Sequence, residues 1–186
     1  CLFDTGDDCI AIKSGRDRDG RRVNRPTENV LVRRCTFRNG HGTVVIGSEM
    51  SGGVRNVLAT DCIADGTDNG VRLKTRHGRG GVVENIVYRN FKLRNMLKYA
   101  ITIDMLYSAG PNPTISPEEE KSGAAIPVFR NIVVENLTCD GVPEAALIRG
   151  LPQSAIRNVT LRNVSITADA PLANPLWDYS RNKIAC

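Results

Sequence analysis

The sequence predicts an all-β protein folded as a right-handed parallel β-helix. A short segment recurs along the chain, with copies beginning at Asn29, Asn56, Asn85, Asn131 and Asn158. Each copy alternates apolar and polar residues, as half-buried strands do. Turn-prone Gly, Asn and Asp residues separate the copies, and no segment shows helical periodicity over three turns. A repeat of roughly 20–50 residues built from strands and turns indicates a solenoid, here with about three strands in each coil.

The elements follow in chain order from this repeat. Successive copies start 27, 29, 46 and 27 residues apart, and their recurrent Asn should form a side-chain ladder at one corner. Shorter apolar runs at 10–12, 44–46 and 71–73 align with one another at offsets of 34 and then 27 residues. The long 46-residue interval holds residues 108–127, which are rich in Pro, Gly and Glu and predict a loop leaving the coil.

The first residues resemble the end of a repeat. Cys35 and Cys62 each follow the recurrent Asn by six residues, and Cys1 opens a similar segment without its Asn and first strand. We therefore expect residues 1–186 to form a single β-helix domain that begins in mid-coil and lacks its amino-terminal coils.

Composition excludes several classes of partner. The chain has 186 residues, 41% of them hydrophobic and 24% charged, which is ordinary for a globular protein with a sizeable core. The formal net charge of +5 favours polyanions, including acidic polysaccharides. Only nine aromatic residues are present, too few and too scattered for a base-stacking platform, so nucleic acid is not expected as a partner. No apolar run has membrane-spanning length, and a membrane partner is not expected either.

The six cysteines form no CxxC pair, which argues against a zinc site. Cys1, Cys35 and Cys62 occupy equivalent repeat positions, and we expect a stacked row of buried small residues rather than disulfides. The glycosylation pattern N-x-[ST] occurs at Asn136, Asn158 and Asn163, but these positions lie in strand segments, so we interpret the matches as coincidence.

Alignment of the apolar runs gathers charged residues that are distant in sequence. In this register Asp7 stands over His41. Arg72 and Lys74 alternate with inward-facing Val71 and Leu73, so both should point out of the third coil. With Asp8, the cluster contains two carboxylates, one histidine and two cations. Three stacked coils span roughly 10 Å, twice the spacing of paired strands, which is about the size of one sugar ring.

The charged and glycine-rich segments have three alternative interpretations. A calcium loop needs more oxygen ligands at alternate positions than Asp4, Asp7 and Asp8 supply, so no metal or other cofactor is expected. The carboxylates could instead cap turn amides in a purely structural role. The glycine-rich segment 78–81 is not followed by a helix, which predicts a turn rather than a phosphate-binding loop.

The motifs in this cluster resemble those of the polygalacturonase family of glycoside hydrolases, family 28. Gly6-Asp7-Asp8, Gly40-His41-Gly42 and Arg72-Leu73-Lys74 are similar to three of the four short motifs of that family, in the same order. The segments 4–15 and 45–53 resemble the bacterial branch. The fourth motif, Asn-Thr-Asp, should precede these by about one coil and has no counterpart here, so a third carboxylate is missing and the chain is expected to be weakly active or inactive.

The resemblance implies hydrolysis of polygalacturonate with inversion, through a general acid and carboxylates that activate water. By resemblance, Asp7 is the general acid with a raised pKa, Asp8 helps hold the water, and His41 tunes the proton on Asp7. Arg72 and Lys74 would pair with the galacturonate carboxylate. Tyr99, one coil further on, is expected either to stack against the sugar or to pack in the structure. The resemblance also implies a monomer, secreted or periplasmic, acting on a pectic chain.

Other functions remain open on the sequence. The polymer could be rhamnogalacturonan or xylogalacturonan. A pectate lyase is also a β-helix protein, but it uses calcium and a basic residue rather than paired acids. A non-catalytic carbohydrate-binding or structural β-helix would not need acids stacked over a histidine.

Overall fold

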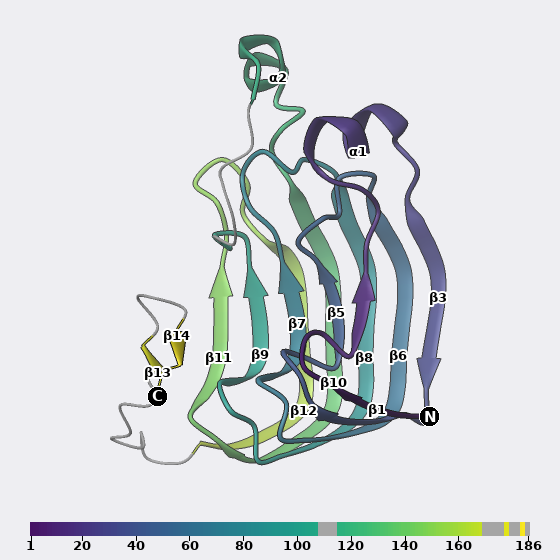
Figure 1. Ribbon diagram of the computed structural model, residues 1–186, viewed down its shortest axis with the longest axis vertical. Helices are drawn as coiled ribbons and strands as arrows, with labels where there is room; N and C mark the ends of the chain where they lie inside the picture. The colour runs from purple at the N-terminus through teal and green to yellow at the C-terminus, as the bar shows by residue number, and fades with distance from the viewer. Residues whose placement is uncertain (108–114, 169–176, 179–182, 185–186) are drawn as a thin grey trace.

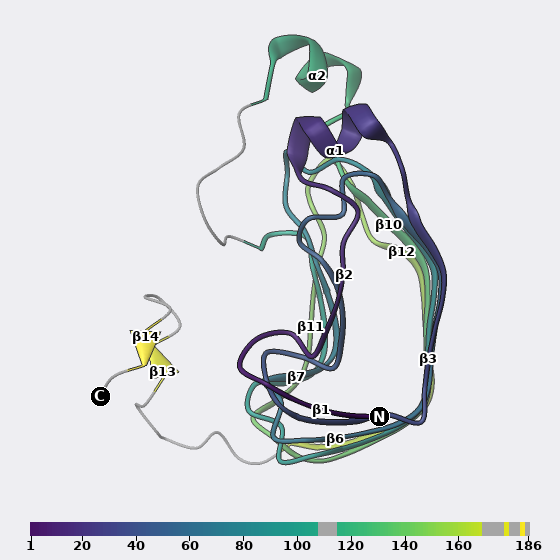
Figure 2. The same cartoon turned by 45° about the vertical axis from the view of Figure 1, so that its right-hand side comes forward.

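The computed structural model describes residues 1–107, 115–168, 177–178 and 183–184, and it is a right-handed parallel β-helix (Figure 1). Figure 2 looks along the stacked coils and shows two sheets on opposite sides of the core. The larger sheet contains, in order, β1 (Leu2–Thr5), β4 (Thr36–Asn39), β6 (Val54–Asp65), β8 (Val82–Arg94), β10 (Val128–Val142) and β12 (Arg157–Ala168), with β3 (Thr27–Arg33) also paired to β6. The smaller sheet contains β2 (Ile10–Ile12), β5 (Val44–Gly47), β7 (Asn69–Lys74), β9 (Tyr99–Asp104) and β11 (Glu144–Arg149).

All pairings within these two sheets are parallel, as stacked coils require. The only antiparallel strand pair in the described part of the chain joins β13 (Trp177–Asp178) to β14 (Lys183–Ile184). Within the described residues, no helix is both long and apolar enough to span a membrane.

The predicted asparagine ladder is confirmed. Asn29, Asn56, Asn85, Asn131 and Asn158 all adopt left-handed backbone conformations, with φ between 53° and 59°. Asparagine tolerates this conformation better than most residues, and here it bends the chain at one corner of each coil. Each side-chain amide donates to the Oδ1 of the Asn in the preceding coil over 3.0–3.2 Å, which continues from Asn158 to Asn29.

A second corner explains two of the three glycosylation-pattern matches. Asn163 donates to Asn136, which donates to Asn90, which in turn donates to Asp61. Arg34 occupies the next place in this row and shares the left-handed conformation, with φ of 53°. Asn158 belongs to the first ladder, so all three pattern matches are corner residues of the coil.

The apolar side chains of both sheets fill the space between them. Cys35 and Cys62 lie in this core in a row continued by Phe91 and Leu137, so the row contains large as well as small residues. The prediction of burial is wrong for Cys1, which is exposed because no strand in the described structure covers the outer side of β1. None of the five cysteines in the described segments forms a disulfide, and Cys186 lies outside the described residues.

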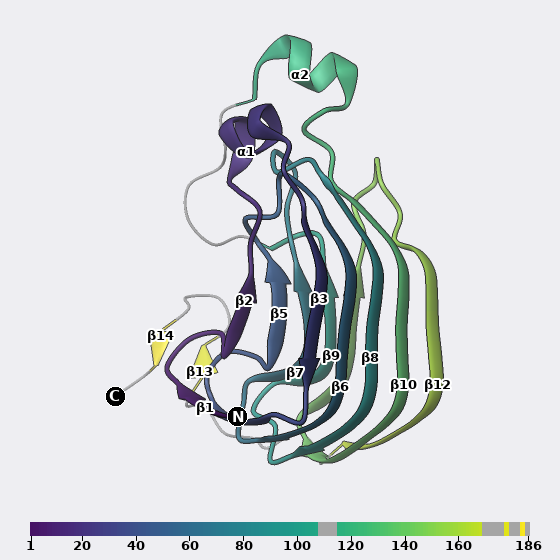
Figure 3. The same ribbon diagram turned by 90° about the vertical axis from the view of Figure 1, so that its right-hand side faces the viewer.

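Two short helices interrupt the β-structure, and neither was expected from the sequence. Helix α1 (Asp17–Val23) and helix α2 (Pro117–Ser122) are shorter than two turns, too short to show helical periodicity. Helix α2 lies within the segment predicted as a loop, and Ser116 and Glu119 form a capping box at its start. Residues 108–114 of that segment lie outside the described residues. Both helices lie along the same edge of the stacked coils, at the top in Figure 3, and Arg21 and Glu119 form an ion pair of 2.6 Å between them.

Candidate active site

The predicted register between the first three coils is confirmed. Ile10 lies beside Val44 and Val44 beside Val71, so strands β2, β5 and β7 stack as the apolar alignment requires. The loops that enter these strands are therefore stacked as well. The backbone N–H of His41 donates to the carbonyl of Asp7 over 3.1 Å, and Nδ1 of His41 lies 3.3 Å from Oδ1 of Asp7.

The two glycines that flank His41 are required by the tight stacking of these loops. Gly40 has φ of 71°, and a Cβ there would overlap the carbonyl oxygen of Asp7. A Cβ on Gly42 would lie 2.7 Å from Cγ2 of Val45 and 3.3 Å from Cδ of Arg72. Glycine lets the backbone approach this closely without steric overlap, and His41 is thereby brought beside Asp7.

Asp8 is neutralised by the two cations of the third coil. Its Oδ1 accepts from Nη1 of Arg72 over 3.1 Å, and its Oδ2 accepts from Nζ of Lys74 over 2.7 Å. The Asp8 side chain is only 6% exposed, and both cations are also largely buried. Burial lowers the pKa of Lys74 and the Arg72 charge adds to this, while the contact with Asp8 opposes the shift. Arg72 and Lys74 thus point out of the core as predicted. Both already form ion pairs with the carboxylate of Asp8, whereas the expected partner was the carboxylate of the sugar.

Asp7 differs from Asp8 in exposure and charge environment. Its side chain is 83% exposed, and its Oδ1 accepts from the backbone N–H of Asp8 over 2.7 Å. That hydrogen bond is the main reason the pKa of Asp7 lies below its ordinary value of 3.8, with slight burial opposing and His41, Lys74 and Lys13 assisting. The expectation of a raised pKa is wrong for this structure, because the Asp8 amide donates a hydrogen bond that stabilises the ionised carboxylate of Asp7.

The turn that carries His41 is held by Arg72 and by two residues that the sequence did not reveal, Asn69 and Thr102. Its carbonyl oxygen accepts from Nδ2 of Asn69 over 2.8 Å and from Nη1 of Arg72 over 3.0 Å. The hydroxyl of Thr102, on the next coil, donates to Oδ1 of Asn69 over 2.7 Å. Asn69 and Thr102 are buried, so these bonds fix the turn that carries His41. The available signal in the sequence was the polar residue Asn69 shortly before the apolar run 71–73.

The aromatic residue that covers the two cations is Tyr107, which the sequence also did not single out. Its ring centroid lies 5.8 Å from Cζ of Arg72 and 5.2 Å from Nζ of Lys74, within cation–π range. Burial raises the pKa of the Tyr107 hydroxyl. Tyr99, the aromatic residue predicted from the sequence, starts β9 beside Asn69. It lines the same cavity as Arg72, Lys74 and Tyr107.

A chain of ion pairs extends the charged surface toward α1. Lys13 Nζ donates to Oε2 of Glu49 over 2.5 Å and to the carbonyl of Gly47 over 2.7 Å. Oε1 of Glu49 accepts from Arg79, a buried residue that also pairs with Asp17 in α1. Burial disfavours ionised Glu49, but the Lys13 hydrogen bond and charge lower its pKa to about 2. Arg79 belongs to the segment 78–81, and a turn lies at residues 77–78, where that segment begins.

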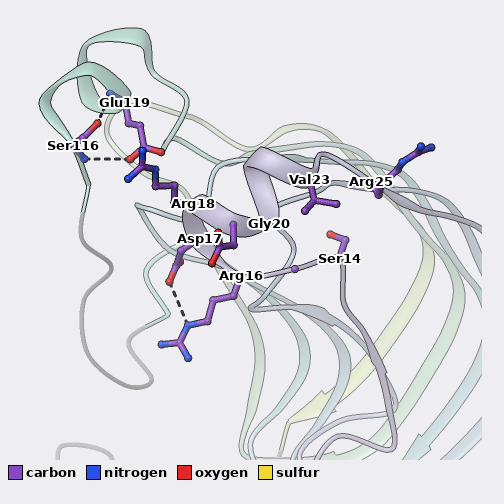
Figure 4. Close-up of a pocket in the computed structure, with 11 residues that line it drawn as sticks. Ser14, Arg16, Asp17, Arg18, Gly20, Val23, Arg25, Ser116 and Glu119 are labelled. Atoms are coloured by element: carbon purple, nitrogen blue, oxygen red, sulfur yellow. Dashed lines mark hydrogen bonds and ion pairs between the residues drawn. The ribbon is translucent and has the colours of Figure 1, made fainter.

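A hollow of about 750 Å³ lies beside α1, away from the cluster formed by Asp7, Asp8 and His41 (Figure 4). Its walls carry charges of both signs, including the pair between Arg16 and Asp17, and Ser116 and Glu119 reach it from α2. None of Asp7, Asp8 and His41 lines it. Across the described residues, no three His, Cys, Asp or Glu side chains are grouped so that they could hold a metal ion.

The outer wall of this β-helix carries two adjacent acids, a histidine and paired cations. This fold and this site are those of the β-helical glycoside hydrolases. Residues 1–181 match the model described as Glycosyl hydrolases family 28, and the chain belongs to that family.

Similar proteins agree with this assignment. A probable polygalacturonase from Vitis vinifera is 33% identical over 178 residues, which cover 95% of this chain and 35% of that protein. The crystal structure of a hyperthermoactive exopolygalacturonase from Thermotoga maritima matches with a TM-score of 0.77 and 36% identity, over 89% of this chain and 37% of that one. A polygalacturonase from Erwinia carotovora ssp. carotovora matches with a TM-score of 0.72 and 29% identity, over 91% and 40%. The chain thus spans well under half the length of these relatives.

Proposed function

We propose that the protein carrying this sequence hydrolyses the glycosidic bonds of polygalacturonate by an inverting acid–base mechanism. The observation that carries the proposal is the contact of Asp7 with His41 beside an Asp8 that is held by Arg72 and Lys74. The names of the similar proteins, an exopolygalacturonase and polygalacturonases, support polygalacturonate over rhamnogalacturonan or xylogalacturonan as the substrate.

In this mechanism the two adjacent carboxylates have different tasks. Asp7 is exposed beside His41 and gives a proton to the leaving oxygen. Asp8 is held in place by two cations, and it helps orient the attacking water on the other side of the bond. Arg72, Lys74 and the Tyr107 ring above them would receive the sugar and its carboxylate.

The lowered pKa of Asp7 sets a requirement on this mechanism. A general acid must be protonated when the bond breaks. In the protein without substrate, however, the pKa of Asp7 lies below 3.8. A bound uronate carboxylate would share the charge of Arg72 and Lys74 and leave Asp8 less compensated. Two under-compensated anions near Asp7 raise its pKa, so the substrate itself would promote protonation of the acid.

The test uses polygalacturonate with the full-length protein that carries this sequence, and with the Asp7→Asn and Asp4→Asn variants of that protein. Asp4 is the matched control, because it lies in β1 only three residues before Asp7 but its Oδ1 accepts from Asn39. New reducing ends without an unsaturated product would identify hydrolysis, whereas an unsaturated product would identify a lyase. Asp7→Asn should lower turnover by roughly a hundredfold to ten-thousandfold, the usual contribution of general acid–base catalysis, and Asp4→Asn should leave it nearly unchanged. Equal turnover in the Asp7→Asn variant would refute the role of Asp7, and binding without turnover would favour a carbohydrate-binding protein.

A further inference from the structure

A cavity of about 400 Å³ lies on the outer face of β7, β9 and β11, next to the cations of the candidate active site. Arg72, Lys74 and Tyr107 form one side of it, and Glu144, Leu147 and Arg149 of the last smaller-sheet strand form the other. In Figure 2 these strands form the side of the coil opposite β8, β10 and β12. The cavity therefore continues the site along the axis of the coils rather than into the core.

The outward-facing side chains of one row change sign from coil to coil. Lys74 lies beside Asp104 in the register of β7 and β9, and Asp104 lies beside Arg149 in the register of β9 and β11. Arg149 is thus two coils from Lys74, about 10 Å at the usual strand spacing. Linked sugars repeat at a shorter distance than this, so a chain bound at Lys74 and running along the axis would bring a later sugar of the same chain to Arg149.

Arg149 is oriented by a bidentate ion pair that leaves part of its guanidinium available. Its Nε donates to Oδ1 of Asp104 over 3.1 Å, and its Nη2 donates to Oδ2 over 2.7 Å. Asp104 is itself fixed, because Oδ1 also accepts from the backbone N–H of Leu106 over 2.9 Å. The two contacts with Asp104 use the Nε edge of the Arg149 guanidinium. Its Nη1–Nη2 end can still bind a second carboxylate in a fork geometry.

Exposure and charge also suit Arg149 to bind an anion. Its side chain is 46% exposed, whereas that of Asp104 is 8% exposed, so the cation is the accessible member of the pair. The Asp104 hydrogen bond raises the pKa of Arg149 and keeps it charged. A pre-oriented arginine loses less entropy when it binds a ligand than a freely rotating one.

We propose that this cavity binds a second uronate residue of the polysaccharide, with Arg149 as the group that recognises its carboxylate and Asp104 as the residue that positions Arg149. The inference rests on the proposed function, because it takes a galacturonate polymer as the ligand. It deepens that function by assigning a second carboxylate-reading position to the last two strands of the smaller sheet.

The test measures binding of galacturonate, trigalacturonate and methyl-esterified trigalacturonate by calorimetry. The variants are Arg149→Gln, Asp104→Asn and, as control, Arg130→Gln. Arg130 is a matched control because it is 47% exposed and contacts Glu84 through the same two nitrogens, but on the larger sheet. Circular dichroism spectra and melting temperatures of all variants would verify that they fold.

We expect Arg149→Gln to weaken binding of trigalacturonate by about tenfold to a hundredfold, as for the loss of a charge-assisted hydrogen bond. Binding of the monomer and of the esterified trimer should be unaffected, and Asp104→Asn should show a smaller loss for trigalacturonate alone. Arg130→Gln should change none of the three affinities. If Arg149→Gln binds trigalacturonate as tightly as the unaltered protein, or weakens monomer and trimer equally, the inference is overturned while the proposed function stands. If the unaltered protein binds none of the galacturonates, the substrate assignment fails and the inference fails with it.

Discussion

Nδ1 of His41 lies 3.3 Å from Oδ1 of Asp7, although 33 residues separate them in the chain. The contact exists because the loops before β2 and β5 are stacked and because Gly40 lets the His41 loop approach the Asp7 carbonyl. The Asp7 carboxylate therefore has two fixed neighbours, the Asp8 amide and the His41 ring.

The first prediction concerns the titration of Asp7. Its carboxyl group should titrate below 3.8, and His41→Ala should raise that pKa without bringing it to 3.8, because the hydrogen bond from the Asp8 amide contributes more than His41. A pKa lowered by folding stabilises the native state above the unfolded value, and this stabilisation is lost as the pH falls through the folded value. The measurement is a carboxyl ¹³C titration by NMR. A titration midpoint above 3.8 in the unaltered protein would contradict the structure.

The second prediction concerns the support of His41 by Asn69. Asn69→Ala removes a donor to the His41 carbonyl and leaves the Thr102 hydroxyl without its acceptor, so we expect a loss of about 1–3 kcal/mol in the free energy of unfolding. The His41 ring resonances should also move, which two-dimensional NMR can follow easily because the chain has only two histidines. Thr102→Ser keeps the hydroxyl and serves as the control. Unchanged His41 resonances in Asn69→Ala would show that Asn69 does not position the ring.

The third prediction concerns the pH dependence of the Lys13–Glu49–Arg79 network. The pKa of Glu49 falls from 4.5 to about 2 on folding, so its ionised form stabilises the native state above pH 4.5, and the effect fades as the pH falls toward 2. Glu49→Gln should therefore destabilise the protein by about 1–2 kcal/mol near pH 6, less than the full shift implies because solvent screens the pair. Near pH 2 the two proteins should be equally stable. Urea unfolding at several pH values measures this, and a difference independent of pH would be inconsistent with the assignment.

The fourth prediction concerns Arg34, a basic residue at a corner that other coils fill with Asn or Asp. Its φ of 53° is costly for most residues but is tolerated by asparagine. Arg34→Asn should raise the free energy of unfolding by about 0.5–1 kcal/mol, as for other substitutions that relieve local strain. Arg33→Asn, in the adjacent strand β3, should not be stabilising. Chemical denaturation of both variants gives the comparison, and a destabilised Arg34→Asn protein would argue against backbone strain at this corner.

Much of the fold, and the stacking that brings the site residues together, could be predicted from the sequence. The strand alternation and the recurrent Asn are local signals, and stacking equal repeats converts sequence offsets directly into neighbours in space. For that reason the register of Ile10, Val44 and Val71 was predictable, and with it the approach of Asp7 to His41.

Only the tertiary structure decided which side chains meet above that register. The pairing of Asp8 with both Arg72 and Lys74 depends on rotamers and on the path of a loop, neither of which has a period in the sequence. The lowered pKa of Asp7 follows mainly from the hydrogen bond that the Asp8 amide donates to it, which depends on the same loop path.

The remaining differences have the same physical origin. Helices α1 and α2 are too short to produce a periodic signal, so propensity alone could not reveal them. Tyr107 lies just after β9, where the strand pattern ends, and its position over the cations is set by how the chain leaves the sheet. The repeat in the sequence therefore determined the coil and the rows on its wall, whereas loop paths and side-chain packing decided which charges are paired and which remain accessible.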